Sequence, residues 1–128
     1  MSESVAFFLL TGPEMPHTPS GTAMPGCRMI HTFIWALDLV DRGGDAKIIL
    51  EGEAPKWLLE LPDPKHGRHP LYRKVKEKGL IDAVCKACAV QAQALEAAAE
   101  EGLRLVYDAS GHVSVVPYLE AGYHLVTL

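Results

Sequence analysis

Two cysteines with Cys-x-x-Cys spacing, Cys85 and Cys88, are the residues of this chain best suited to chemistry. They stand where an apolar run at 80–84 meets an alanine-rich stretch that predicts a helix at 89–101. At a helix N-terminus, free backbone N–H groups and the helix dipole favour an anion. We therefore expect the thiol pKa to fall below its free value of about 8.5, which would supply a thiolate for sulfur chemistry.

The cysteine pair is compatible with several reactions. Its i and i+3 spacing lets the two Cβ atoms approach to the roughly 3.5–4.5 Å that a disulfide requires. Dithiol redox, persulfide carriage, metal ligation and simple packing of two buried thiols all stay open. A structural zinc site commonly uses two such pairs, and Cys27 with His112 or His31 would have to complete the set here. We therefore expect no metal and no cofactor.

Three further residues are candidates for supporting roles: Cys27, Lys86 and His112. Lys86 stands between the two thiols and could hold an anion there. His112 follows Ser-Gly at an expected helix start, where it could transfer a proton, stabilise a thiolate, or serve only as a hydrogen-bonded loop residue. Glu51 and Glu53 could orient that imidazole or simply be solvated.

Strand-like and helix-like segments alternate along the chain, which predicts an α/β fold with a mostly parallel sheet. The expected strands are 5–10, 46–50, 80–84, 103–107 and 123–128, and the expected helices are 27–42, 54–61, 70–78, 89–101 and one or two turns within 110–122. About five parallel strands then form a flavodoxin-like three-layer sandwich. We expect it to span residues 1–128 as a single domain.

Every candidate residue follows a predicted strand, and sites in open parallel sheets form beyond the carboxyl ends of the strands. The loop at 11–26, rich in Pro, Gly, Ser and Thr, and Cys27 come after the first strand. Glu51 follows the second strand, the cysteine pair the third and His112 the fourth. If the strand order is that of flavodoxin, the first and third strands are neighbours, and Cys27 would share an edge with the pair.

Size and charge exclude several classes of function. A chain of 128 residues with 48% hydrophobic residues can bury a core as one domain. Its net charge of -4 gives no broad basic field for nucleic acid, and the basic stretch at 65–78 predicts a solvated helix face. No signal-peptide pattern and no apolar run of about 20 residues is present, so we expect a cytoplasmic protein with no membrane contact and reduced thiols.

Four segments together resemble a known family. They are Phe-Phe-Leu-Leu-Thr-Gly at 7–12, Ile-Ile-Leu-Glu-Gly at 48–52, the block at 79–88 that ends in Cys-x-x-Cys, and Gly-Tyr-His-Leu-Val-Thr-Leu at 122–128. In these motifs the chain resembles the DsrE/DsrF-like family of small α/β proteins. The resemblance implies a flavodoxin-like sandwich, a homo-oligomer, and a cysteine persulfide passed between sulfur donor and acceptor proteins.

The resemblance places the relay cysteine just after the third strand, at Cys85 or Cys88. The relay branch of that family uses one such cysteine, whereas this chain has two within one turn and a third at Cys27. We expect a cytoplasmic sulfur carrier or sulfurtransferase-like protein, with Cys85 the more accessible thiol. The alternatives are a thiol-disulfide or peroxide-reducing enzyme using the same pair, and a non-catalytic oligomer that binds a small ligand or metal. The sequence does not decide between an enzyme with turnover and a carrier.

Overall fold

The computed structural model describes residues 2–13 and 26–128. Most of the predicted loop at 11–26 therefore lies outside the described residues. The elements are β1 (Ser4–Leu9), α1 (Cys27–Asp41), β2 (Asp45–Leu50), the 3-10 helix η1 (Ala54–Leu59), α2 (His69–Glu77), β3 (Ile81–Cys85), α3 (Lys86–Gln91), α4 (Leu95–Glu100), β4 (Leu105–Val106), α5 (Val116–Glu120) and β5 (His124–Thr127).

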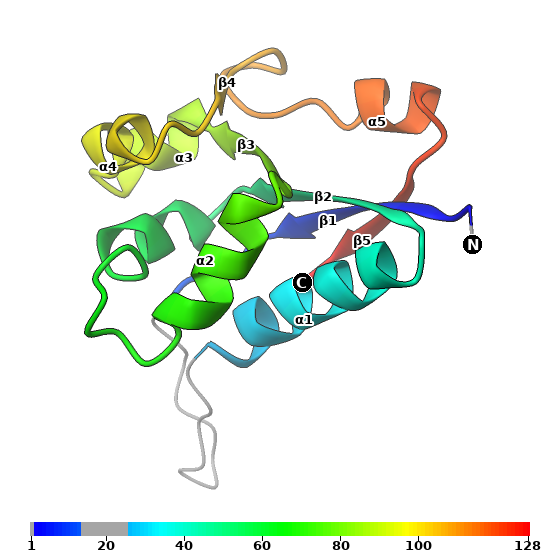
Figure 1. Cartoon of the computed structure of the whole chain (residues 1–128). Helices are drawn as coiled ribbons and strands as arrows, with labels where there is room; N and C mark the ends of the chain where they lie inside the picture. Colours follow the sequence, from blue (N-terminus) through cyan, green and yellow to red (C-terminus); the bar gives the residue numbers. More distant parts are fainter. Residues whose placement is uncertain (1, 14–25) are drawn as a thin grey trace, which may run out of the picture.

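The strands form one parallel sheet in the order β4-β3-β2-β1-β5 (Figure 1). The register aligns Phe7 with Ile48 across β1 and β2, and Val84 with Leu105 across β3 and β4. This confirms the predicted α/β fold with a five-stranded parallel sheet. β2 lies between β1 and β3, so the adjacency of the first and third strands that a flavodoxin order would give does not occur.

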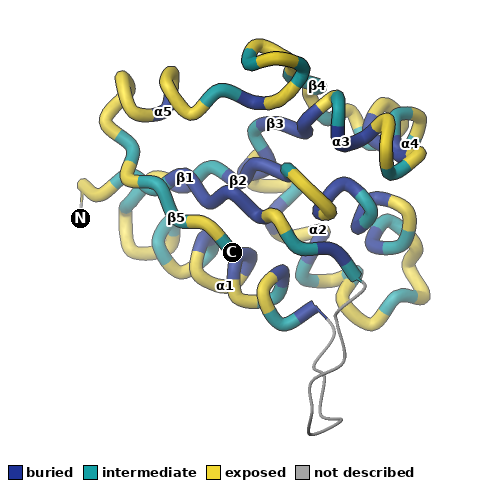
Figure 2. The backbone as a smooth tube through the Cα atoms, turned by 180° about the vertical axis from the view of Figure 1, so that it is seen from behind, coloured by how far each residue is buried: buried dark blue, intermediate teal, exposed yellow. Residues whose placement is uncertain are grey.

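Helices cover both faces of the sheet, with α1 and α2 on one side and α5 on the other (Figure 1). The larger core cluster includes Phe33 of α1 and Tyr72 of α2. The smaller cluster lies on the α5 side, where the ring of Tyr118 meets that of Phe8 edge-on at 5.6 Å between centroids. Figure 2 shows β1, β2 and β3 buried along most of their length, and burial on both faces explains why the carboxyl halves of β1 and β2 are apolar throughout.

The predicted helix at 89–101 is two helices, α3 and α4, because the chain turns between them. Gln93 adopts a left-handed conformation with φ 56°. The N–H of Gln93 donates to the carbonyl of Val90, and the N–H of Ala94 donates to that of Ala89. These two bonds form a Schellman motif, which ends α3 despite strong helix formers on both sides. The turn buries Ala94 completely, so packing overrides local propensity.

Three other predicted segments differ in kind or extent. The helix expected at 54–61 is η1, a 3-10 helix with a proline in its first turn. The strand expected at 103–107 is the two-residue β4, and the helical turns expected within 110–122 reduce to α5. Across residues 2–13 and 26–128, no helix has the length and apolar character that would let it cross a membrane.

Candidate functional site

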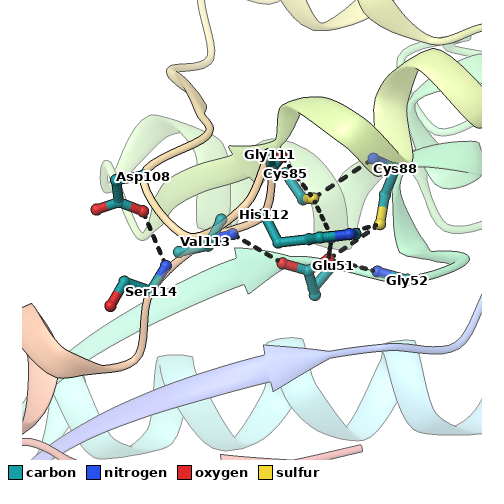
Figure 3. Close-up of polar contacts among 9 residues, drawn as sticks. All are labelled: Glu51, Gly52, Cys85, Cys88, Asp108, Gly111, His112, Val113 and Ser114. Atoms are coloured by element: carbon teal, nitrogen blue, oxygen red, sulfur yellow. Dashed lines mark hydrogen bonds and ion pairs between the residues drawn. The ribbon is translucent and has the colours of Figure 1, made fainter.

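Four side chains from three neighbouring strands meet at the carboxyl edge of the sheet (Figure 3). β2, β3 and β4 are adjacent and parallel, so the residues that follow them emerge side by side. Glu51 follows β2, Cys85 ends β3 with Cys88 one turn into α3, and His112 lies in the loop after β4. The sequence prediction that Cys85, Cys88 and His112 share one edge is therefore met, and Glu51 joins them.

The two thiols lie within hydrogen-bonding distance of both polar partners. Cys88 Sγ lies 2.9 Å from Oε1 of Glu51 and 3.6 Å from Nδ1 of His112. Cys85 Sγ lies 3.2 Å from Nδ1 of His112. The same nitrogen is 3.0 Å from Oε1 of Glu51. Nδ1 of His112 thus lies near both sulfurs. Oε1 of Glu51 contacts the Cys88 sulfur and the same Nδ1.

Glu51 is held in place by backbone groups around it. Its Oε2 accepts a hydrogen bond from the Val113 N–H at 3.1 Å, which ties the end of β2 to the loop after β4. Gly52 turns the chain immediately after it with φ 59°, and a Cβ at Gly52 would lie 2.8 Å from the carbonyl oxygen of Leu10. Glycine is required there because a side chain would be both strained and obstructed. The carboxylate therefore has a fixed orientation.

A tight turn presents His112. Ala109 and His112 exchange two backbone hydrogen bonds of 2.9 Å, and the residues between them, Ser110 and Gly111, have φ of 53° and 88°. Positive φ at both central positions is the pattern of a type I′ turn. The carbonyl of Gly111 accepts the Ala87 N–H at 3.0 Å, so the turn docks on the first turn of α3.

Exposure increases across the four side chains from the sheet outward. Cys85 is fully buried and Cys88 is 9% exposed. The side chain of Glu51 is 14% exposed and that of His112 is 51% exposed. The expectation that Cys85 is the more accessible thiol is therefore wrong, because it is the last residue of β3 and packs beneath α3. His112 forms the solvent side of the site, and Cys88 is the less deeply buried of the two thiols.

The thiols do not have the lowered pKa that the helix start predicted. Burial raises the pKa of Cys85 and of Cys88, and the hydrogen bond and negative charge of Glu51 raise both further. Of the N–H groups expected to favour a thiolate, that of Ala87 donates to the carbonyl of Gly111 instead, and that of Cys88 donates to Cys85 Sγ at 3.4 Å but lowers the pKa of Cys85 by less than burial raises it. The dipole of α3, which is only six residues long, does not offset these effects. Because the pKa of each thiol is raised, both thiols are protonated at neutral pH.

Glu51 behaves in the opposite way. Burial alone would raise its pKa, but hydrogen bonds from Cys85 and Cys88, from the Val113 N–H and from His112 outweigh it and lower the pKa to about 2. The carboxylate is therefore ionised whenever the protein is folded near neutral pH. A permanent anion between two protonated thiols is the main electrostatic feature of the site.

Two residues expected beside the pair lie elsewhere. Cys27 begins α1, which covers the sheet face opposite α5, and its Sγ lies 3.5 Å from Nδ1 of His31 on the same helix. The Lys86 ammonium lies 4.4 Å from the centroid of the Tyr107 ring, in a cation–π arrangement. Among the described residues, the group of four donors does not include Cys27. The supporting roles expected of Cys27 and Lys86 stay predictions.

Sequence reasoning identified Glu51 only as a possible partner of the histidine and missed its contact with Cys88. Glu53, expected in the same role, instead forms an ion pair with Lys56. The signal that would have found Glu51 is strand order, since β2 is the neighbour of β3. Chemically, the site can support proton transfer at sulfur, sulfur–sulfur bond formation and ligation of a metal ion by four donors.

The fold and the site define a parallel α/β protein with two thiols, a carboxylate and an imidazole grouped at the carboxyl edge of its sheet. No family model matches the chain, and no solved structure does. Over 100 residues the chain is 38% identical to "Uncharacterized protein MJ0733" of Methanocaldococcus jannaschii, a match that covers 78% of this chain and 79% of that protein. The chain belongs to the same family as this protein.

Proposed function

We propose that the protein is a sulfur carrier or sulfurtransferase-like protein in which Cys88 accepts a sulfane sulfur as a persulfide. The observation that carries the proposal is the position of Cys88. It is the less deeply buried thiol of the pair, at 9% exposed against a fully buried Cys85, and it has both Glu51 and His112 within hydrogen-bonding distance. The resemblance to the DsrE/DsrF-like family, whose relay cysteine follows the third strand, supports the same assignment.

A protonated thiol needs a base before it can attack, and His112 is placed to act as one. At rest Nδ1–H donates to Oε1 of Glu51 at 3.0 Å, so the ring first exchanges to the Nε2–H tautomer, in which Nδ1 can accept the Cys88 proton across 3.6 Å. The imidazolium that forms lies 3.0 Å from the Glu51 carboxylate, which stabilises it. Glu51 thus positions the base and compensates its charge, while His112 moves the proton.

The transfer step then balances without an oxidant or reductant. The Cys88 thiolate attacks the outer sulfur of a donor persulfide, R–S–SH, and the donor sulfur–sulfur bond breaks as the new one forms. The leaving thiolate takes the proton from His112 and departs as R–SH. The product is a persulfide on Cys88, and an acceptor thiol reverses the same step to take the sulfur onward.

The raised thiol pKa favours a carrier loaded by a docked partner over a thiol that reacts freely in solution. Such a carrier requires a sulfur donor protein and a sulfur acceptor protein. We place it in the cytoplasm, where a reducing environment keeps Cys85 and Cys88 free. We further propose a homo-oligomer, which light scattering on the purified chain would test.

Dithiol redox is the second candidate function, because the sulfurs of Cys85 and Cys88 lie within 4.8 Å of each other. A small rearrangement would bring them to bonding distance. In that reaction the two thiols lose two hydrogens to an oxidant such as a peroxide or a disulfide. The fully buried Cys85 would then act as the resolving thiol for the less deeply buried Cys88.

Intact-mass spectrometry separates the two functions. Reduced, chelator-treated protein is incubated with glutathione persulfide, and we expect a gain of one sulfur atom in the wild type and in Cys27→Ser, but not in Cys88→Ser. Loss of two hydrogens without any sulfur gain would replace the carrier function with dithiol redox. An unchanged mass in the wild type would exclude the carrier function, and an unchanged mass after hydrogen peroxide is added instead would exclude dithiol redox.

A further inference from the structure

The four side chains of the site also form a set of metal ligands, and we infer that they bind a divalent zinc-type ion. One donor atom each from Glu51, Cys85, Cys88 and His112 lies within 4.8 Å of the other three. No two of these donors other than Cys85 and Cys88 lie near each other in the sequence. The fold itself therefore assembles the set.

The spacing fits a tetrahedral ion with little movement. Zinc bonds of about 2.0–2.3 Å place neighbouring donors roughly 3.3–3.8 Å apart in a tetrahedron. The distances here are 3.2 Å from Cys85 Sγ to His112 Nδ1, 3.6 Å from Cys88 Sγ to the same nitrogen, and 3.0 Å from that nitrogen to Glu51 Oε1. Shifts of a few tenths of an ångström suffice for these pairs, and since all four donors lie within 4.8 Å of one another, shifts of about 1 Å or less bring the remaining pairs to the same spacing.

The donor types select the class of ion. Two sulfurs and an imidazole suit zinc and its neighbours among the transition metals, whereas calcium and magnesium require oxygen donors. With both thiols deprotonated, Cys85, Cys88 and Glu51 contribute three negative charges against the two positive charges of the ion. Binding therefore releases two protons, forms two metal–sulfur bonds and changes no oxidation state.

Backbone groups already orient the ligands from outside, as in established metal sites. The Val113 N–H holds Oε2 of Glu51, which leaves Oε1 facing the other donors. The Cys88 N–H donates to Cys85 Sγ. The half-exposed ring of His112 gives an ion access from solvent. Such a supported set is ready for an ion without folding around it.

Four protein ligands complete a tetrahedron, so a bound ion would leave no open position and would occupy both thiols. On the proposed sulfur-carrier function, the metal-bound form is therefore a masked form in which Cys88 cannot accept sulfur. Ion binding itself does not depend on that function; the masking does. Loss of the ion to a chelator or to a competing site would free both thiols, and Cys88 could then accept sulfur.

Cobalt is the spectroscopic probe for this site. Reduced, metal-free full-length protein is titrated with Co²⁺ under nitrogen, and we expect one equivalent to bind, with thiolate-to-cobalt charge-transfer absorption and the strong visible bands of tetrahedral Co²⁺. Stoichiometric Zn²⁺ should abolish these bands by displacement. An octahedral cobalt spectrum, or no saturable binding, would overturn the inference.

Matched variants locate the ion. Cys88→Ser should abolish the charge-transfer bands of that sulfur, and His112→Asn, a change at a half-exposed side chain that keeps the fold, should weaken Co²⁺ binding at least about tenfold. Cys27→Ser removes the third cysteine, which has its own histidine neighbour, and should bind as the wild type does. Loss of binding in Cys27→Ser with retention in Cys88→Ser would refute the site.

The same protein samples separate failure of the metal site from failure of the sulfur function. We expect metal-free protein to take up one sulfur atom from glutathione persulfide and the zinc-loaded protein to take up none. If zinc binds at this site and the metal-free protein takes no sulfur, the proposed function is wrong and the metal site stands. If sulfur is taken up equally with and without zinc, the masking is refuted.

Discussion

The Sγ atom of Cys88 lies 2.9 Å from Oε1 of Glu51, so the less deeply buried thiol of the pair donates a hydrogen bond to an ionised carboxylate. The contact joins the first turn of α3 to the end of β2, across the edge of two neighbouring strands. It keeps the thiol protonated at rest. In the proposed mechanism, reactivity at Cys88 then depends on the base beside it, His112, rather than on the helix start.

Replacing Glu51 with glutamine should make the thiols of metal-free protein more reactive. The carboxylate raises the pKa of Cys88 by its charge and by its hydrogen bond, and glutamine removes the charge. We expect the rate of iodoacetamide labelling near pH 7 to rise roughly 10-fold, the effect of one pKa unit. The measurement is the labelling rate of Cys88 as a function of pH.

The matched control is Glu53→Gln, which removes the neighbouring exposed carboxylate and should leave labelling unchanged. The pH profile distinguishes electrostatics from loosening of the loop after β4. A lowered midpoint supports the charge effect. A uniform increase at every pH, with the midpoint unmoved, would show that Glu51 acts only by holding the loop.

Replacing His112 with asparagine should slow sulfur uptake without unfolding the protein. The imidazole accepts the Cys88 proton in the proposed step, and such a group typically contributes about 10²-fold or more. We expect the rate of sulfur gain from glutathione persulfide to fall by about that factor near pH 7 and to recover partly at high pH. His31→Asn, a change on α1, should retain the wild-type rate; equal rates in the two variants would remove His112 from the mechanism.

Replacing Gly52 with alanine should destabilise the fold and disturb the site. The backbone has φ 59° there, and the added Cβ would lie 2.8 Å from the carbonyl oxygen of Leu10. We expect a loss of about 1–3 kcal/mol in the free energy of unfolding, measured with urea. Gly67→Ala is the control, since a Cβ there meets nothing within 4 Å, and a similar loss in both variants would contradict the steric argument.

Acid should weaken the fold partly through Asp82. Burial by itself would raise the pKa of this carboxyl, but the hydrogen bond from Tyr118 and the charges of Lys47 and Arg104 lower it overall. A folded-state pKa below the unfolded one means that the ionised carboxylate stabilises the fold above the unfolded pKa. That stabilisation is lost as the pH falls below about 4, through the folded-state value.

The variant Asp82→Asn should therefore show a shallower loss of stability between neutral pH and acid than the wild type. At neutral pH it should cost about 1–3 kcal/mol, as expected for a hydrogen-bonded charge that loses its partners. Urea unfolding at several pH values gives both numbers. Asp38→Asn, at an exposed i,i+4 ion pair with Arg42, should change neither; an unchanged acid slope in Asp82→Asn would contradict the assignment.

The order of elements was predictable because apolar runs and helix formers alternate clearly along the chain. The break between α3 and α4 was not predictable from propensity, since Gln93 is a helix former that adopts a left-handed conformation. It turns there because Ala94 and Ala98 bury completely against the core. Strand order was also beyond the sequence, because pairing of β2 between β1 and β3 depends on contacts far apart in the chain.

The part of the site that depends on local sequence spacing was predictable. Cys85 and Cys88 were found from their own motif, and His112 from its position after a strand. Glu51 as a thiol partner required strand order, and the raised thiol pKa required knowing that both sulfurs are buried and that the Glu51 carboxylate faces them. Cys27 was misplaced because α1 covers the opposite face of the sheet from the thiol pair.

Trypsin offers the most direct test of the central claim, that Cys88 accepts the sulfur. Cleavage at Arg28, Lys78, Lys86 and Arg104 places the three cysteines on separate peptides, 1–28, 79–86 and 87–104. Metal-free protein is exposed to glutathione persulfide, alkylated and digested, and each peptide is examined by mass spectrometry. We predict one added sulfur atom on 87–104; sulfur only on 79–86 or 1–28, or on none of the three, would contradict the account.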